Sequence, residues 1–358
     1  MVTEHDKTAG VTELAYAHGG PLGEALLRSC PEDFFVDETL GFEPTGEGEH
    51  IWLHIEKRGA NTGWVAGRIA RLSGVPERDV GFSGMKDRHA VTRQWFSVPA
   101  PRGREVDWAR IGEEEGLRLL SVSRHNRKLR RGTHRANRFV LRLREVGVSE
   151  AMLAARIACV VEQGVPNYFG EQRFGREGGN LPRARAFFAG EYRPRGRSEQ
   201  GMLISAARSA VFNRVLDERV RALTWNTLID GEMAMLDGTS SVFAVESPED
   251  PVLRERLARF DIHPTGPLWG RGEPATRDRC QALEIQSAEA DAPLCRGLEA
   301  AGLVQERRAL RLLPLDLAYQ YDTGAGLVEL SFTLPAGCFA TVVLRELFQT
   351  REPETRPE

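Results

Sequence analysis

The stretch GFSGMKDRHAVTRQWFSV, residues 81–98, sets four ionisable side chains in a row, Lys86 to His89, between apolar and β-favouring residues. One interpretation is a solvated hairpin loop, which is the commoner outcome for such a pattern. The other is a reactive group held at a strand end by a rigid scaffold. Asp87 is the candidate for that group, because a carboxylate can attack a carbon, stabilise a positive centre or accept a proton.

Other patterns that could carry chemistry are incomplete. GFSGM departs from the nucleophile elbow GxSxG at Met85. The HxE pattern at His54 lacks the PCxxC partner of a zinc deaminase. There is no Walker A or HExxH sequence, and the five scattered cysteines include no CxxC pair. We therefore expect a side-chain mechanism with no metal and no cofactor.

The positive charge is unevenly distributed, although the net charge is only −3. Residues 124–144 contain nine Lys or Arg and no Asp or Glu. Such a run indicates a phosphate-binding surface, unless acidic partners from elsewhere in the fold neutralise it as a solvated face. The candidate phosphate contacts are Arg127, Lys128, Arg130, Arg131 and Arg135.

Periodicity predicts the elements around the charged stretch. Residues 51–55 alternate as a half-buried strand, and Asn61 or Thr62 caps a helix that follows. Residues 81–98 form strand, loop and strand, and two more strands, 116–123 and 138–146, flank the basic run. A helix then runs from Ser149 to a stop at Gly164.

The pattern changes after Gly164. Residues 165–200 have weak periodicity, a long helix covers 203–223, and residues 246–308 show mainly helical patterns. Strand alternation returns after Leu312, followed by a helix near Gly337. We predict a discontinuous strand-rich domain, 1–163 and 312–358, interrupted by a mainly helical insertion, 164–311. The charged residues 351–358 are expected to be disordered.

Composition sets the broad class. The 358 residues are 41% hydrophobic and 28% charged, which is typical of a soluble globular protein. No apolar run approaches the length of about 18 residues that a membrane-spanning helix needs. The N-terminus lacks the apolar core of a signal peptide, so we expect a cytoplasmic protein with no membrane partner. No obligatory protein partner is evident.

The charged stretch resembles the active-site signature of the TruD family of tRNA pseudouridine synthases. The matching residues are Gly84, Lys86, Asp87, Ala90, Thr92 and Gln94. Four further stretches resemble the family in its order, from about Tyr16 to Phe348: PEDFFVDE, RANRFVLRLREV, GVPNYFGEQRFG and LPAGCFATVVLREL.

The resemblance implies an α+β protein with the pseudouridine-synthase fold, a mixed and largely antiparallel sheet with flanking helices and a family-specific insertion. It also implies an isomerase that acts on tRNA. The reaction would convert one uridine, at position 13 in the bacterial family, to pseudouridine without cofactor or metal.

The same resemblance assigns site residues. Asp87 would be catalytic, and Phe139 would be the flat wall for the detached uracil. The pocket would be completed by Phe34, Asn137, Gly164 and Phe339. A buried carboxylate needs a nearby cation to stay ionised. The candidates are Lys86, which as a strand neighbour would point to the opposite face, and Arg28.

Several alternatives remain at this point. Phe139 has the strand parity of Leu141 and Leu143, so it could equally be a core residue. The chain could carry out the same chemistry on another RNA, or it could be an RNA-binding protein that kept the fold without the activity. The sequence does not choose among C1′ attack, oxocarbenium stabilisation and C2′ proton abstraction.

Overall fold

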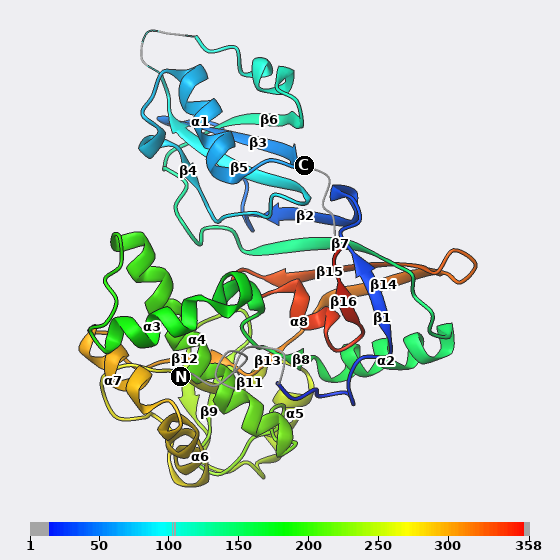
Figure 1. Ribbon diagram of the computed structural model, residues 1–358, viewed down its shortest axis with the longest axis vertical. Coiled ribbons are helices and arrows are strands. Elements are labelled where there is room, and N and C mark those ends of the chain that lie inside the picture. Colours follow the sequence, from blue (N-terminus) through cyan, green and yellow to red (C-terminus); the bar gives the residue numbers. More distant parts are fainter. Residues whose placement is uncertain (1–13, 102, 104, 354–358) are drawn as a thin grey trace. The chain divides into compact units, whose positions relative to one another are not determined.

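The computed structural model describes residues 14–101, 103 and 105–353 of the chain (Figure 1). The chain divides into two compact units. One unit consists of the residues through Gly20, Arg156–Leu313 and Thr341–Leu347, and the other of Pro21–Ala155, Pro314–Ala340 and the residues from Phe348.

The second unit contains a ten-stranded sheet, which we call the central sheet (Figure 1). Its strand order is β14-β15-β7-β2-β5-β3-β6, while β1 pairs with β7 and β16, and β4 pairs with β5. The pairs β2–β5 and β1–β16 are parallel and the others are antiparallel. The strands are β1 (Glu24–Leu27), β2 (Phe34–Thr39), β3 (His50–Arg58), β4 (Gly81–Phe82), β5 (Val91–Pro99), β6 (Leu117–His125), β7 (Ala136–Arg144), β14 (Leu315–Asp322), β15 (Leu327–Pro335) and β16 (Gln349–Arg351).

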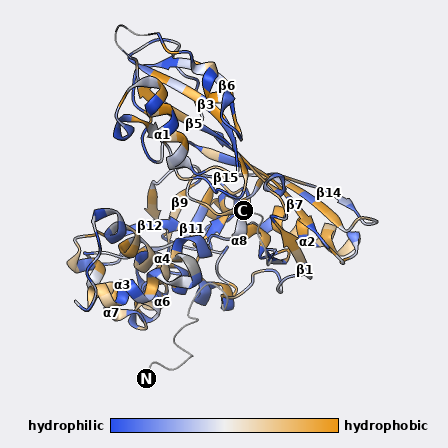
Figure 2. Cartoon of the chain, turned by 45° about the horizontal axis from the view of Figure 1, so that its top comes forward, coloured by the Kyte–Doolittle hydropathy of each residue, from blue (hydrophilic) through white to orange (hydrophobic). Residues whose placement is uncertain are grey.

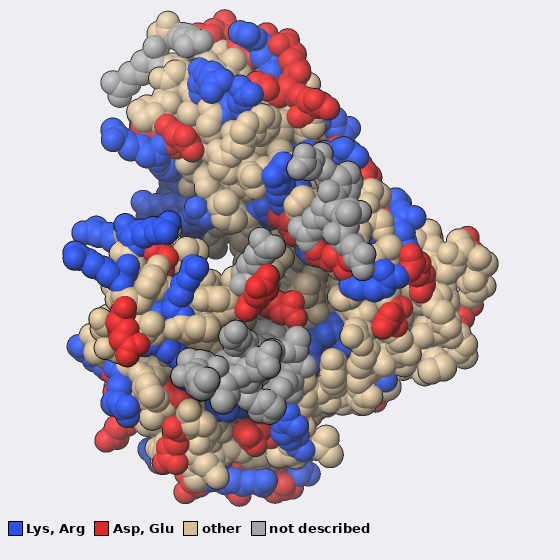
Figure 3. All heavy atoms as spheres, in the orientation of Figure 1, with Lys and Arg blue, Asp and Glu red and all other residues tan. Residues whose placement is uncertain are grey.

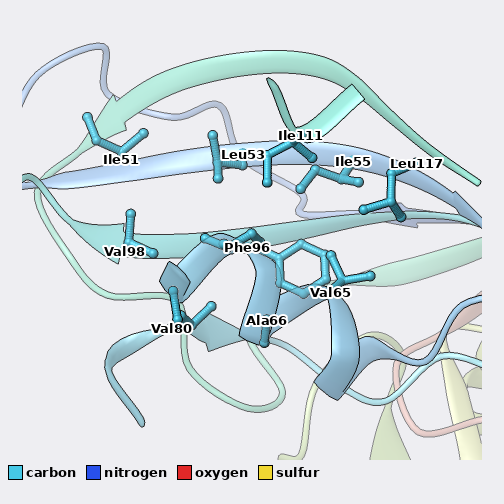
Figure 4. Close-up of a cluster of buried hydrophobic side chains, with 12 residues drawn as sticks. Ile51, Leu53, Ile55, Val65, Ala66, Val80, Phe96, Val98, Ile111 and Leu117 are labelled. Carbon is cyan, nitrogen blue, oxygen red and sulfur yellow. The ribbon is translucent and has the colours of Figure 1, made fainter. Parts of the chain in front are cut away.

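Helix α1 (Thr62–Ser73) packs on β3 and β5 through a common apolar cluster. Ile51, Leu53 and Ile55 point to one side of β3, and Val65 and Ala66 meet them from the helix (Figure 4). The period of two in the strand and the i, i+3/i+4 spacing in the helix therefore produce one core. Figure 2 shows the resulting alternation of hydrophobic and hydrophilic residues along these strands.

The predicted elements of this unit are present. β3 covers the alternating residues 51–55, β6 and β7 flank the basic run, and β15 covers the alternation after Leu312. Helix α2 (Glu150–Gln163) ends before Gly164, whose φ of 77° lies in the left-handed region. A short helix, α8 (Ala340–Leu344), follows Gly337. The part of α2 from Arg156 and the part of α8 from Thr341 belong to the first unit.

The first unit combines helices with two small sheets. The long helix α4 (Arg197–Arg221) matches the predicted helix over 203–223, and it buries Val211, Phe212 and Val215. The other helices are α3 (Asn180–Phe188), α5 (Pro251–Ala258), α6 (Asp278–Glu289) and α7 (Ala292–Ala300). The strands are β8 (Val165–Pro166), β9 (Met233–Leu236), β10 (Val242–Ala244), β11 (Ile262–Leu268), β12 (Glu306–Ala309) and β13 (Arg311–Leu312).

The four-stranded sheet β10-β9-β11-β12 was not expected in a mainly helical insertion. Its central strand, β11, has the sequence IHPTGPL, in which two prolines and a glycine imitate a turn. Six of these seven residues are buried, and burial between β9 and β12 stabilises a strand that local propensity disfavours.

Two other differences concern the boundaries of the predicted insertion and of the predicted disordered tail. The observed units divide the chain at Gly20 and inside α2, so the predicted limits of the family-specific insertion stay a prediction. Arg351 was expected in a disordered tail, but it belongs to β16, which pairs in parallel with β1. Residues 354–358 of that tail lie outside the described residues.

Candidate active site

Asp87 lies in the loop 83–90, between β4 and β5. Two hydrogen bonds tie this loop to the side chains of Gln94 and Thr62, and a third joins those two side chains. Gln94 Nε2 donates to the carbonyl oxygen of Gly84 at 2.6 Å. The Lys86 backbone N–H donates to Thr62 Oγ1 at 3.0 Å, and that hydroxyl donates to Gln94 Oε1 at 3.0 Å. Thr62 and Gln94 are fully buried, so β5 and α1 fix the loop through a shielded network.

Lys57, on β3, binds the backbone of the same loop. Its Nζ donates to the carbonyl oxygen of Asp87 at 3.1 Å and to that of Ala60 at 2.7 Å. The side chain is fully buried, and this burial lowers the pKa of Lys57 to about 8, against the opposing effect of the Asp87 charge. The lysine therefore fixes the backbone position from which the Asp87 carboxylate projects.

The Asp87 carboxylate is paired with Arg28. Arg28 Nη2 lies 2.7 Å from Asp87 Oδ2, and the backbone N–H of His89 donates to Oδ1 at 3.0 Å. The side chain of Arg28 is 9% exposed and that of Asp87 is 23% exposed, so the carboxylate keeps an open side while its counter-charge is shielded.

Arg28 is held from three directions. Its Nη1 donates to Glu352 Oε1 at 2.6 Å, and its guanidinium carbon lies 4.1 Å from the centroid of the Phe34 ring. The backbone of Arg28 has a φ of 61°, a left-handed conformation that is unfavourable for a residue with a Cβ. Burial lowers the pKa of Arg28 and the Asp87 charge raises it, but an arginine stays charged at neutral pH.

Lys86 has a different partner. Its Nζ lies 2.7 Å from Oε2 of Glu38, a fully buried residue of β2. Burial raises the pKa of Glu38, and the charge of Lys86 opposes the shift. The neighbours Lys86 and Asp87 thus enter separate ion pairs, with Glu38 and Arg28 respectively.

Phe139 lies in the middle of the central sheet, on β7. It is opposite Val36 of β2 and Phe332 of β15, and it is 7% exposed. Its ring packs edge-on against Phe34, with centroids 6.2 Å apart, and at a tilt against Phe332, with centroids 5.6 Å apart. Asp87, Arg28, Phe34 and Phe139 therefore form a continuous series of contacts within one unit.

Asn137 precedes Phe139 on the same side of β7 and contacts His134. Asn137 Nδ2 lies 3.3 Å from His134 Nε2, and both residues are buried. The His134 backbone N–H donates to Ser83 Oγ at 3.2 Å, which joins this segment to the start of the Asp87 loop. Burial, together with the charge of Lys86, lowers the pKa of His134 to about 4.

Gly164 and Phe339 are the remaining two pocket candidates. Gly164 belongs to the other unit, where its left-handed backbone passes the carbonyl of Leu312 so closely that a Cβ would lie 2.7 Å from that oxygen. This close approach is by itself a structural reason for a glycine at position 164. Phe339 is half-buried directly before α8. The binding roles of both residues stay predictions.

The basic run lies on the same unit as Asp87. Its two C-terminal arginines pair with acids, Arg142 with Glu329 and Arg144 with Asp33. No described acidic residue forms an ion pair with the five candidate phosphate contacts, of which Lys128 is half-buried and the four arginines, Arg127, Arg130, Arg131 and Arg135, are exposed.

Two cations of this run contact uncharged groups of the protein. Lys128 Nζ donates to the carbonyl oxygen of Arg78 at 2.9 Å, and the guanidinium of Arg131 lies 4.3 Å from the centroid of Phe82. Figure 3 shows positive and negative side chains mixed over the visible face, so the net charge does not mark a binding face. The local excess of unpaired arginines is the informative feature.

Sequence reasoning missed Lys57 and Glu38 as residues that position the loop, although a signal was present. Lys57 has the strand parity of Ile51, Leu53 and Ile55, and Glu38 has that of Phe34 and Val36. A charged residue on the buried face of a strand requires a partner. Both residues end such an apolar face, next to the loop.

The described residues contain neither a metal-binding cluster nor a membrane-spanning helix. No group of three or more His, Cys, Asp or Glu side chains there could hold a metal ion. None of the described helices is long and apolar enough to cross a membrane.

Comparison with known proteins gives the family. The family model for tRNA pseudouridine synthase D (TruD) matches residues 12–182 and 197–347. The chain belongs to this family. Two curated relatives, both named tRNA pseudouridine synthase D, come from Nitrosococcus oceani, 48% identical over 98% of this chain and 97% of the relative, and from Pseudomonas aeruginosa, 45% identical over 92% of each.

A solved structure shows the same fold. A crystal structure of a Methanosarcina mazei protein, described as a tRNA pseudouridine synthase D, matches with a TM-score of 0.71 and 20% identity over 93% of this chain and 95% of that one. The α+β pseudouridine-synthase fold implied by the motifs is thereby confirmed. Family membership makes the chain an isomerase, a pseudouridine synthase.

Proposed function

We propose that this pseudouridine synthase converts one uridine of tRNA, at position 13, to pseudouridine, with Asp87 as the acting carboxylate and without cofactor or metal. The observation that carries the proposal is the Asp87–Arg28 pair, formed in the loop between β4 and β5, in a chain of the TruD family. A carboxylate paired with a buried arginine, with its other side open, suits a reaction at a ribose carbon.

The reaction exchanges one glycosidic bond for another. The bond from C1′ to N1 breaks, the base turns, a bond from C1′ to C5 forms, the C5 proton leaves and N1 gains a proton. Asp87 would attack C1′, stabilise an oxocarbenium-like centre there or remove the C2′ proton, and each route requires the ionised carboxylate. The uridine must first leave its stack, as for other enzymes that modify a base.

The aromatic series offers a surface for the detached base. Phe139 is linked to Asp87 through Phe34 and Arg28, by ring contacts and a cation–π contact. A flat apolar ring would hold uracil by stacking while leaving it free to turn. Asn137, two residues earlier on β7, would contact the polar edge of the base.

The decisive experiment uses the purified protein and a tRNA transcript with no additives. We expect pseudouridine to form in the wild type, and Asp87→Asn, which removes only the charge, to lower its rate by several orders of magnitude. The affinity for tRNA should stay the same or increase, because an anion near the RNA backbone is gone. Conversion by Asp87→Asn, after mass spectrometry has excluded deamidation, would contradict the role of Asp87.

The same assay separates the alternatives. A chain that binds tRNA but converts no uridine is an RNA-binding protein with this fold. Mapping pseudouridine in RNA from cells with and without the gene tests position 13 and would reveal another RNA target. Recognition of folded RNA relies mostly on shape and backbone, so this mapping is needed to fix the position.

A further inference from the structure

His134 and Asn137, beside the Asp87 loop, each keep one buried polar atom without a hydrogen-bond partner. The two residues are 9% and 8% exposed, and the unpartnered atoms are Nδ1 of His134 and Oδ1 of Asn137. Buried polar atoms are nearly always paired, because leaving them unpaired is unfavourable. Two such atoms side by side, next to the Asp87 loop, suit a ligand that supplies the missing partners.

Their location connects them with the active loop. The backbone N–H of Gly132 donates to the Ser83 carbonyl oxygen at 2.8 Å, and that of His134 donates to Ser83 Oγ at 3.2 Å. His134 Cε1 lies 3.9 Å from where a Cβ on Gly84 would be. Asn137 shares a side of β7 with Phe139, the proposed platform for the base.

The contact between the two side chains decides which unpartnered atom donates a hydrogen bond and which accepts one. Asn137 Nδ2, which only donates, lies 3.3 Å from His134 Nε2, so Nε2 accepts. The ring is neutral at pH 7, because burial and the charge of Lys86 lower the pKa of His134 to about 4. Its proton is therefore on Nδ1. The pair leaves one N–H donor and one carbonyl acceptor.

We propose that His134 and Asn137 together read the polar edge of the extruded uracil, and that His134 is a specificity-determining residue. Asn137 Oδ1 accepts from uracil N3–H, and His134 Nδ1–H donates to one of the two carbonyl oxygens. Cytosine has an acceptor at N3, so it opposes Asn137 Oδ1; where His134 Nδ1–H faces position 4 of the base, the N4 amino group of cytosine opposes that contact as well. The proposal rests on the proposed function of the same site.

The chemistry of the turn supports this pairing. A half-turn of uracil about the line through N3 and C6 exchanges N1 with C5 and O2 with O4, and it leaves N3 in place. The edge therefore keeps its order of acceptor, donor and acceptor. One acceptor and one donor, held in fixed relation by the Asn137–His134 contact, hold the base equally well before and after the turn.

The test measures how the enzyme responds to a weaker acceptor on the base. Transcripts carry uridine, 2-thiouridine or 4-thiouridine at the target position, and kcat/KM for pseudouridine formation is compared. A thiocarbonyl accepts a hydrogen bond poorly, so in the wild type we expect at least one thio transcript to react about fivefold more slowly, the value of one neutral hydrogen bond.

His134→Gln tests the residue itself. The glutamine keeps an acceptor for Asn137 Nδ2 but has no group at the position of Nδ1. We expect His134→Gln to react about fivefold more slowly with the uridine transcript. The further slowing caused by the thiocarbonyl, which we call the thio penalty, should disappear. His125→Gln is the matched control, because His125 is also 9% exposed but bonds to Thr45, and it should keep the wild-type penalty.

Each outcome is decisive. A penalty that persists in a folded His134→Gln protein overturns the proposal, and so does the lack of any penalty in the wild type, which needs no variant. If His134→Gln fails to fold by thermal melting, the wild-type penalties decide alone. If the wild type forms no pseudouridine even with uridine, the proposed function has failed instead.

Discussion

Arg28 Nη2 lies 2.7 Å from Asp87 Oδ2, while the same guanidinium lies 4.1 Å from the centroid of the Phe34 ring. One shielded cation thus contacts both the proposed acting carboxylate and the aromatic series that leads to Phe139. We predict that Arg28→Met lowers kcat/KM by about 100- to 1,000-fold, because removing one partner of a buried pair leaves the other charge uncompensated. Single-turnover assays on a tRNA transcript measure the loss.

Arg28→Lys separates charge from shape. It restores a cation next to Asp87, and both variants keep a Cβ at the left-handed φ of 61°, so backbone strain is the same in the two. We expect Arg28→Lys to recover most of the activity that Arg28→Met loses. Arg88 lies in the loop that carries Asp87 and has an exposed side chain, so the activity of Arg88→Met should be close to that of the wild type. Equal activity of Arg28→Met and Arg88→Met would refute the role of Arg28.

Lys57 should make stability depend on pH. Burial lowers its pKa to about 8 in the folded chain, from 10.5. Between these values the unfolded chain binds more protons than the folded one, so the free energy of unfolding gains a contribution that rises with pH across this window. Below pH 8 both states are protonated and the penalty for burying the charge is fully present.

Lys57→Met removes this contribution. Urea unfolding near pH 7 and pH 10 should show that the stability of the wild type relative to Lys57→Met increases with pH. The matched control is Lys128→Met, which removes a half-buried lysine of the basic run. Pseudouridine formation by Lys57→Met should also fall, because the carbonyl oxygen of Asp87 loses its donor. A difference between wild type and Lys57→Met that is independent of pH would contradict the prediction.

The unpaired arginines should determine how tRNA binding responds to salt. Changing Arg127, Arg130 and Arg131 to Gln should reduce the slope of log Kd against log salt concentration by about 2 to 3, at about 0.7 to 0.9 per phosphate contact. Fluorescence anisotropy at several salt concentrations measures the slope.

A matched triple variant keeps the change in net charge the same. Arg110, Arg118 and Arg254 are exposed and pair with Glu113, Glu56 and Glu249, so their charges are already compensated. Their change to Gln should leave the slope nearly unaltered. If the two triple variants give the same slope, the basic run is a solvated face.

Most of the central sheet was predictable, because its strands and α1 follow simple periodicities. The charged loop stood out for the opposite reason, since Lys86 to His89 contradict the strand pattern on both sides. Family motifs added the fold and named Asp87 and Phe139. Such motifs identify residue types but not their partners.

The partners depended on contacts between distant parts of the chain. Arg28 reaches Asp87 from an irregular segment after β1, and Glu38 meets Lys86 from β2. The sequence offered Lys86 and Arg28 as partners of Asp87, but no local pattern decided between them or indicated Glu38. β11 was missed because Pro264 and Pro267 disfavour a strand locally, whereas the neighbouring strands stabilise it. Sequence thus indicated where local preferences conflict, and tertiary contacts decided the result.

Phe139 tests whether a buried aromatic residue serves the core, the reaction or both. Its ring packs between Phe34 and Phe332, which suits a core residue, and it joins the series that ends at Asp87. Phe139→Leu keeps an apolar side chain but removes the flat ring. Base stacking on an aromatic ring is worth about 1–3 kcal/mol, so we expect kcat/KM to fall about 10- to 100-fold.

The affinity for tRNA should change little, because phosphate contacts carry most of it. Phe139→Tyr keeps the ring face and should retain most activity. Phe332→Leu is the control, since Phe332 is also buried, 1% exposed against 7% for Phe139, and packs on the same ring from β15. We expect both leucine variants to lower the melting temperature by similar amounts, as a volume-reducing core change does. Only Phe139→Leu should then lose activity beyond that loss of stability; if Phe332→Leu is equally inactive, Phe139 acts as part of the core alone.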